Sequence, residues 1–143
     1  MNNQTAIKEL IKSVSGQANI LAVPRIYIDL LNGDINAAIM LSQIVYWSDK
    51  SKRPDGWFYK SAAEWKAETG LSIYKIKRAE KLLHEKGLIE IELHRANNAP
   101  TNHYKLNLDF LSDLITQFLD YRETDKSDLL ETDKSDLAKT DKS

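Results

Sequence analysis

Residues 61–87 read SAAEWKAETGLSIYKIKRAEKLLHEKG, and this stretch decides the fold. Ser61 and Glu64 have the spacing of a capping box, which predicts that a helix begins at Ser61. Gly70 ends that helix, because glycine readily adopts the left-handed conformation that follows a helix. Ser72 then caps a second helix that continues to the end of the quoted stretch. Two short capped helices joined by a glycine turn predict a helix-turn-helix.

The segments on either side of this motif predict a small antiparallel sheet. WFYK at 57–60 is short and aromatic, as expected for a first strand, and Leu88–His94 has the alternation of a half-buried strand. His103–Leu108 is expected to pair with it across a loop that contains Asn97, Asn98 and Pro100. We refer to this hairpin as the wing. The expected fold is mainly α with a small antiparallel β-wing (α+β), a winged helix-turn-helix with helical extensions at both ends.

Apolar residues at helical spacing predict further helices outside this core. The expected helices are Thr5–Val14, one within Ile20–Asn32, one capped by Asp34 and one over Leu108–Tyr121. The expected organisation is an N-terminal helical extension at 1–19, a winged-helix domain at 20–121 and a flexible acidic linker at 122–143.

Composition narrows the possible functions. The chain has no cysteine, and its three histidines do not have the spacing of metal ligands, so we expect neither disulfides nor a metal site. It lacks phosphate-binding loops and nucleophile motifs, so we expect no enzyme, no cofactor and no small-molecule substrate. The helical carboxylates, including Glu68 and Glu80, are expected at caps or on exposed faces. Because the chain has no long apolar segment, we expect it to make no contact with a membrane and to be located in the bacterial cytoplasm.

Charge is distributed unevenly along the chain. The formal net charge is −1, but residues 50–106 contain twelve Lys and Arg against seven Asp and Glu. A local basic surplus of this kind is typical of phosphate binding. We therefore expect double-stranded DNA as the partner.

The second helix of the motif carries the main candidate contacts. Ile76, Ala79 and Leu83 form its buried face, so the opposite face is expected to meet the major groove. Lys77 and Arg78 suit guanine, and Lys81 suits a phosphate. The other candidates on this helix are Ser72, Ile73, Tyr74 and Lys75. The alternative interpretation is an ordinary solvated helix face.

The wing and the start of the first helix carry the remaining candidates. Arg95 is placed to reach the minor groove or the DNA backbone at the wing tip. The other wing candidates are His94, Asn97, Asn98, Thr101, His103 and Lys105, and Lys60 and Ser61 are expected to contact the DNA backbone. A polar hairpin that touches nothing is the alternative.

The run from Ile20 to Leu108 resembles the N-terminal winged-helix domain of bacteriophage and prophage replication initiators, also called replisome organisers. The resemblance rests on VPRIYIDLLNGDINAAIMLSQIVYW, WFYKSAAEWKAETGLS and RAEKLLHEKGLIE. It implies binding to origin repeats, a homodimer or higher oligomer, and recruitment of replisome proteins through a separate C-terminal domain. Glu80 departs from the family's pattern, in which Leu is frequent at that point.

From Glu123 the sequence ETDKSDLLETDKSDLAKTDKS repeats with a period of eight residues and carries few apolar side chains. It predicts a flexible linker, and its interruption in the third copy suggests that a longer protein continues beyond Ser143. Eight codons correspond to 24 base pairs, so one hypothesis is that the repeat encodes the chain's own binding sites. A linker lengthened by slippage is the other interpretation.

The leading hypothesis is the sequence-specific DNA-binding domain of a phage or mobile-element replication initiator, dimeric through the first helix or the helix at Leu108–Tyr121. Two alternatives stay open, a winged-helix transcriptional regulator and a winged helix that binds only protein.

Overall fold

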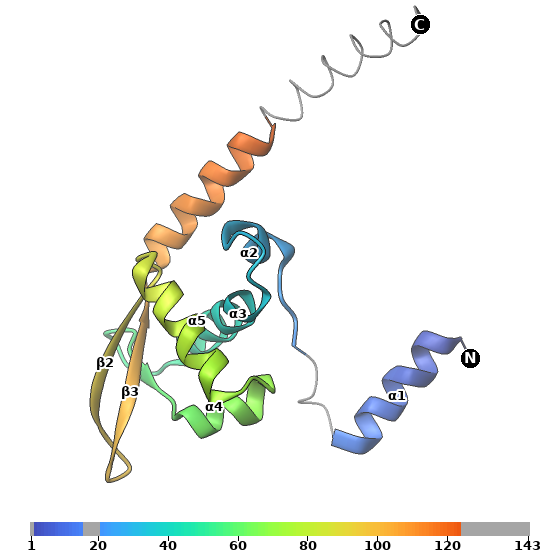
Figure 1. Ribbon diagram of the computed structural model, residues 1–143, viewed down its shortest axis with the longest axis horizontal. Coiled ribbons are helices and arrows are strands. Elements are labelled where there is room, and N and C mark those ends of the chain that lie inside the picture. Colours follow the sequence, from blue (N-terminus) through green and yellow to red (C-terminus); the bar gives the residue numbers. More distant parts are fainter. Residues whose placement is uncertain (1, 16–20, 124–143) are drawn as a thin grey trace, which may run out of the picture. The chain divides into compact units, whose positions relative to one another are not determined.

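The computed structural model describes residues 2–15 and 21–123, which divide between two compact units, 1–106 and 107–143. The octapeptide repeat lies outside the described residues. The expected domain boundaries after residues 19 and 121 stay predictions. No helix of the described part has the length and apolar character needed to cross a membrane. The first unit contains α1 (Asn3–Ser15), α2 (Arg25–Leu30), α3 (Ile35–Lys50), β1 (Phe58–Tyr59), α4 (Ala62–Thr69), α5 (Ile73–Glu85), β2 (Ile89–Ala96) and β3 (Ala99–Leu106) (Figure 1).

The predicted caps form as the sequence indicates. Ser61 Oγ accepts the Glu64 N–H at 3.1 Å while Glu64 Oε1 accepts the Ser61 N–H at 3.1 Å, which is a complete capping box. Gly70 ends α4 in the left-handed conformation, with a φ of 75°. Ser72 Oγ accepts the Lys75 N–H at 3.3 Å and so begins α5. These local signals confirm the predicted helix-turn-helix of α4 and α5.

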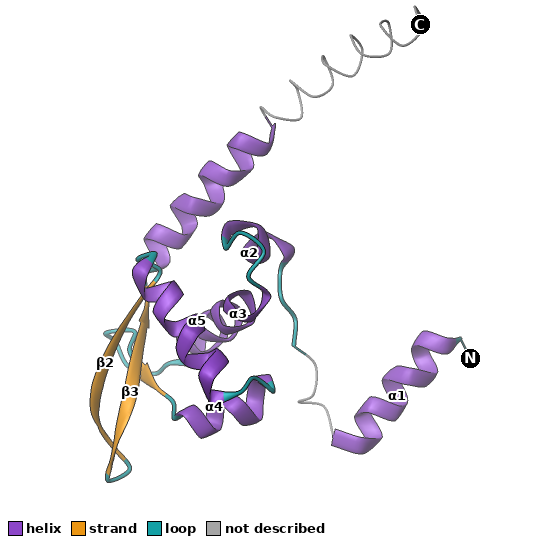
Figure 2. Ribbon diagram, viewed as in Figure 1, coloured by secondary structure: helices purple, strands orange, loops and turns teal. Residues whose placement is uncertain are grey.

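The three strands form an antiparallel sheet in the order β1-β3-β2, so the fold is the expected α+β winged helix (Figure 2). The hairpin differs in detail from the prediction, because its turn contains only Asn97 and Asn98. Their φ values of 54° and 65° suit a type I′ turn, which Asn tolerates and which matches the twist of the strands. Pro100 therefore lies within β3, paired with Arg95, rather than in a loop.

The core lies between the sheet and helices α3, α4 and α5. Trp65 of α4 is fully buried, and its ring meets that of Tyr104 edge to face at 5.6 Å. The Phe58 ring of β1 stacks on that of Tyr104 at 5.5 Å and lies 6.3 Å from the Trp65 ring. From α5, Ile76, Ala79 and Leu83 are buried, which confirms the predicted inner face of that helix. The inner face fixes the rotation of α5 and so determines which side chains it exposes.

The second unit contains a helix over residues 108–123. Asn107 Oδ1 accepts the Phe110 N–H at 3.3 Å at its start, so this helix has its own cap. Leu108, Leu119 and Tyr121 are exposed on it.

Candidate nucleic-acid interface

The outer face of α5 presents the candidate side chains to solvent. The structure exposes all seven of the expected residues, and Tyr74 stands out with 72% of its surface accessible. Lys81 Nζ lies 4.0 Å from Glu85 Oε1, a solvent-exposed pair that contributes little and that a phosphate can replace. Contact with DNA stays a prediction. The exposed residues are Ser72, Ile73, Tyr74, Lys75, Lys77, Arg78 and Lys81.

The wing runs alongside this helix. β2 follows the C-terminal end of α5 and turns back, so the hairpin turn points in the same direction as the N-terminal end of α5 (Figure 1). In helix-turn-helix docking the N-terminal residues of the second helix approach the base edges. The fold thus brings the two predicted contact regions to one end of the first unit.

The other flank of α5 lies beside the start of α3, an arrangement that sequence alone did not predict. A shallow depression of about 370 Å³ separates Ile35 and Asn36 from Tyr74, Lys75 and Arg78. Asp34 Oδ1 accepts the Ala37 N–H at 3.0 Å there, which confirms the predicted cap of α3. The sequence predicted Asp34 as the cap at which α3 begins, but the position of Asp34 near Arg78 depends on tertiary packing.

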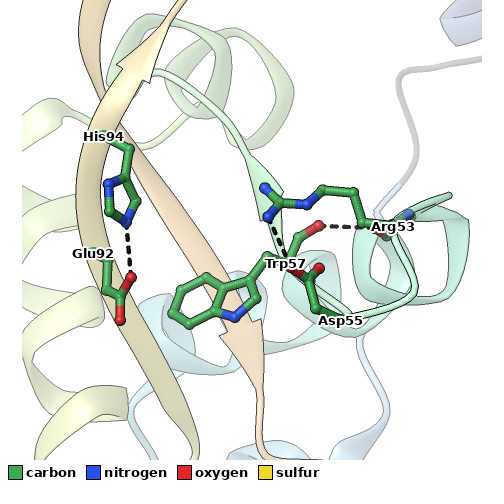
Figure 3. A network of polar contacts seen from close by, with 6 residues as sticks. Arg53, Asp55, Trp57, Glu92 and His94 are labelled. Atoms are coloured by element: carbon green, nitrogen blue, oxygen red, sulfur yellow. Dashed lines mark hydrogen bonds and ion pairs between the residues drawn. The ribbon is translucent and has the colours of Figure 1, made fainter.

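The wing tip carries exposed polar side chains with contacts of their own. His94 Nε2 lies 2.8 Å from Glu92 Oε2 on β2, a pair shown in Figure 3 with the separate Arg53–Asp55 ion pair of the loop before β1. An Arg95 guanidinium N–H donates to the Asn98 carbonyl oxygen at 3.4 Å. Besides these, Asn97 and Asn98 are exposed, and Thr101 and Lys105 are half-buried.

His103 does not fit its predicted role, because it is only 6% exposed. Its ring lies 5.2 Å from the Tyr59 ring and 5.2 Å from the His94 ring, on the sheet face away from the helices. Its Nδ1 lies 3.0 Å from the Thr101 carbonyl oxygen. We therefore remove His103 from the candidate contacts and assign it to the packing of the outer sheet face.

Lys60 is a second correction. It is 8% exposed and forms an ion pair with Glu68, instead of reaching outward to DNA. Its ammonium lies 3.7 Å from the Trp47 ring centroid and 4.6 Å from that of Trp65. Burial lowers the pKa of Lys60, and the hydrogen bond and charge of Glu68 oppose that shift. Lys60 thus joins β1, α3 and α4 within the fold.

Glu68 is correspondingly not the exposed carboxylate that was expected. Its Oε1 accepts the Gln43 Nε2–H and the Trp47 Nε1–H, each at 2.6 Å, while Oε2 accepts from Lys60. Ser61, the other backbone candidate, uses its hydroxyl and its N–H in the capping box of α4.

Glu80 is a further correction, because it lies on α5 but is only 7% exposed. The Tyr104 hydroxyl donates to Glu80 Oε1 at 3.0 Å, and Asn102 Nδ2 donates to Oε2 at 3.4 Å. Burial raises the pKa of Glu80, and these hydrogen bonds together with the charge of Lys77 oppose the shift. Burial, followed by the nearby Glu80 charge, also raises the pKa of Tyr104. This contact joins the back of α5 to β3 of the wing.

Within residues 2–15 and 21–123, no group of three or more His, Asp or Glu side chains is placed to hold a metal ion. The site as described consists of exposed cations, amides and an aromatic ring on α5 and the wing. These groups are chemically suited to hydrogen bonds and ion pairs with a polyanion.

Comparison with known proteins supports the fold. No family model matches the chain, and no curated protein matches its sequence. A solved structure described as a possible transcriptional regulator from Methanosarcina mazei Go1 is similar, with a TM-score of 0.50 and 14% sequence identity. The match covers 73% of this chain and 82% of that one. At this identity the similarity concerns the fold alone.

Proposed function

We propose that the protein binds double-stranded DNA in a sequence-specific manner through α5 and the wing. The observation that carries the proposal is the outer face of α5, where Lys75, Lys77, Arg78 and Lys81 surround the exposed Tyr74. An α-helix with its side chains is about 10–12 Å wide and the major groove about 12 Å, so a helix offered in this way fits the groove. The proposal assigns the chain a binding role and no catalytic step.

Within this proposal the side chains divide by position. Ile73, Tyr74, Lys77 and Arg78 lie in the first half of α5, where base edges are approached, so the two cations suit guanine and the two apolar groups suit a thymine methyl. Lys81 lies a turn further on and suits a phosphate, which positions the helix without reading sequence. Arg95 at the wing tip suits a narrow minor groove.

The biological role has two candidates that share this surface. The name of the similar solved structure supports a transcriptional regulator. The resemblance of Ile20–Leu108 to phage replication initiators supports origin binding, which would further require replisome partners outside this chain. We place the transcriptional role first, because a solved structure with a similar fold carries that description. Either role places the protein with DNA in the bacterial cytoplasm.

Three α5 cations provide the test of DNA binding. Changing Lys75, Lys77 and Arg78 together to Ala should weaken binding by 100-fold or more, since each base contact contributes about 1–3 kcal/mol. Fluorescence anisotropy with a labelled duplex selected from random DNA measures the change. The control changes Lys12, Lys50 and Lys52 together to Ala, since these lysines are also exposed and their loss removes the same charge from elsewhere. Equal affinity for the two triple variants would refute the assignment.

The selected sites distinguish the two roles. A single palindrome favours a transcriptional regulator, whereas direct repeats favour origin binding, and a footprint on the DNA that encodes the octapeptide repeat tests the self-encoded sites. We also propose a homodimer, since a palindromic site would mirror a two-fold axis. Light scattering on the purified chain measures the mass, and a monomer both with and without DNA would exclude the dimer.

A further inference from the structure

A groove lies on the side of the first unit formed by α3 and α4, and we call it the α3–α4 groove. It encloses about 800 Å³ and is lined mainly by apolar atoms. Tyr46 and Trp47 of α3 form one wall, Ala67 of α4 lies opposite, and Leu21 and Ala22 border it. Tyr46 keeps 51% of its surface exposed, which is high for a large aromatic side chain in a concave site. An apolar hollow of this size is typical of a binding surface.

The polar groups of the α3–α4 groove favour a positively charged occupant. Lys60 and Glu68 neutralise each other, and Glu64 adds one further negative charge. Glu64 Oε1 is used in the capping box, while its Oε2 accepts no hydrogen bond from the described residues. An occupant that carries a cation next to an apolar surface could therefore pair with Glu64 and cover the apolar lining of the groove.

Helix α1 has the matching chemistry. Ile7 and Leu10 lie one turn apart on its apolar stripe, and 54% and 59% of their surfaces are exposed. At about 100° per residue, Lys8 borders that stripe on one side and Glu9 on the other, while Lys12 lies on the opposite face. The helix thus offers apolar side chains with the Lys8 ammonium group along one edge.

The chain itself keeps α1 close to the groove. Five residues separate Ser15, the last residue of α1, from Leu21, which borders the groove. Six fully extended residue steps reach at most about 20 Å, so the C-terminal end of α1 always remains within roughly that distance of the rim. A short tether of this kind gives an effective concentration in the millimolar range, which favours contact within one chain over contact between chains.

We propose that α1 binds in the α3–α4 groove of its own chain, with Ile7 and Leu10 against Tyr46, Trp47 and Ala67 and with Lys8 beside Glu64. This contact buries the apolar stripe of α1 and covers the outer side of α4. It lies on different residues from those of the proposed DNA surface and does not depend on DNA binding.

Engineered disulfides test the contact directly, because the chain has no cysteine of its own. The variant combines Leu10→Cys with Ala67→Cys, both at exposed positions that tolerate substitution. Mild oxidation at low protein concentration should give an intramolecular disulfide, detected as a faster-migrating monomer and as a linked peptide by mass spectrometry. Lys12→Cys with Ala67→Cys is the matched control, since Lys12 is exposed on the same tethered helix but on its opposite face.

The proposal predicts that the Leu10 pair forms its disulfide at least ten times faster than the Lys12 pair. Equal rates would mean that the tether alone brings the cysteines together, and they would overturn the proposal. A product that consists mainly of linked dimers would also overturn it, in favour of α1 from a second copy. No disulfide in either variant would exclude the contact.

A second measurement avoids new cysteines. The Trp47 indole N–H lies at the groove, so its NMR resonance reports on occupation of this site. Changing Ile7 and Leu10 together to Ser should shift that resonance, whereas Lys12→Gln on the opposite helix face should leave it unchanged. Glu64→Gln, which keeps an oxygen for the cap, should slow formation of the Leu10 disulfide several-fold at low salt and not at high salt. An unmoved Trp47 resonance in the Ile7 and Leu10 variant would contradict the proposal.

Discussion

Removing the hydroxyl of Tyr104 tests how α5 is joined to the wing. Tyr104→Phe keeps the ring contacts with Phe58 and Trp65 but deletes the hydrogen bond at 3.0 Å to Glu80. The buried carboxylate then keeps only the 3.4 Å bond from Asn102 among its hydrogen bonds. A hydrogen bond to a charged group contributes about 1.5–3 kcal/mol, so the free energy of unfolding should fall by about 2 kcal/mol at neutral pH.

Urea denaturation followed by circular dichroism measures this loss, and a melting temperature lower by roughly 10 °C should accompany it for a domain of this size. Tyr59→Phe is the matched control, because Tyr59 lies on the neighbouring strand with 45% of its surface exposed. We expect that control to change the free energy by less than about 0.5 kcal/mol. The loss in Tyr104→Phe should shrink at acidic pH, where Glu80 is protonated in both states. A loss no larger than that of Tyr59→Phe would refute the assigned contact.

Three other substitutions test neighbouring contacts. In wild type, the raised pKa of Glu80 means that folding favours the protonated carboxyl, so the stability that this protonation contributes is lost as pH rises from the ordinary pKa of 4.5 through the folded pKa. Glu80→Gln should abolish that decline in the free energy of unfolding, measured by urea titration at several pH values. An unchanged pH profile would contradict the assignment. Ser61→Ala should cost about 1 kcal/mol in thermal unfolding by loss of the α4 cap, and full stability would contradict the capping role. Lys60→Met should lower the free energy of unfolding by about 2 kcal/mol, which is below the usual range for a broken buried ion pair because Glu68 keeps two hydrogen bonds. The control Lys66→Met, at an exposed position, should lower it little. Equal effects of the two substitutions would show that the ion pair contributes nothing.

The helices and the fold class were predictable because their signals are local. The caps of α4 and α5 depend on Ser61, Glu64 and Ser72, each within a few residues of the backbone group that it satisfies. Gly70 itself forms the turn that ends α4. The sequence alone therefore determines where α4 and α5 begin and where α4 ends. The inner face of α5 followed from apolar spacing in the same way.

The errors concern charged or polar side chains whose partners are distant in the sequence. Glu80 lies next to Ala79 at the edge of the buried stripe, and it is satisfied by a hydroxyl 24 residues later. Lys60 needs α3 and α4 packed together before Trp47 and Glu68 surround it. His103 faces the outer side of the sheet, but Tyr59 of the neighbouring strand covers it. Residue type alone predicted exposure at all three positions, and tertiary packing reversed it.

The dependence of DNA affinity on salt is the most direct test of the central claim that α5 and the wing bind duplex DNA. Each neutralised phosphate contributes about −0.9 to the slope of log affinity against log salt for duplex DNA. We predict a linear decrease for the wild type, and a slope smaller in magnitude by roughly 1–3 when Lys75, Lys77 and Arg78 are changed to Ala. Absence of binding at low salt, or the same slope in both proteins, would contradict the account.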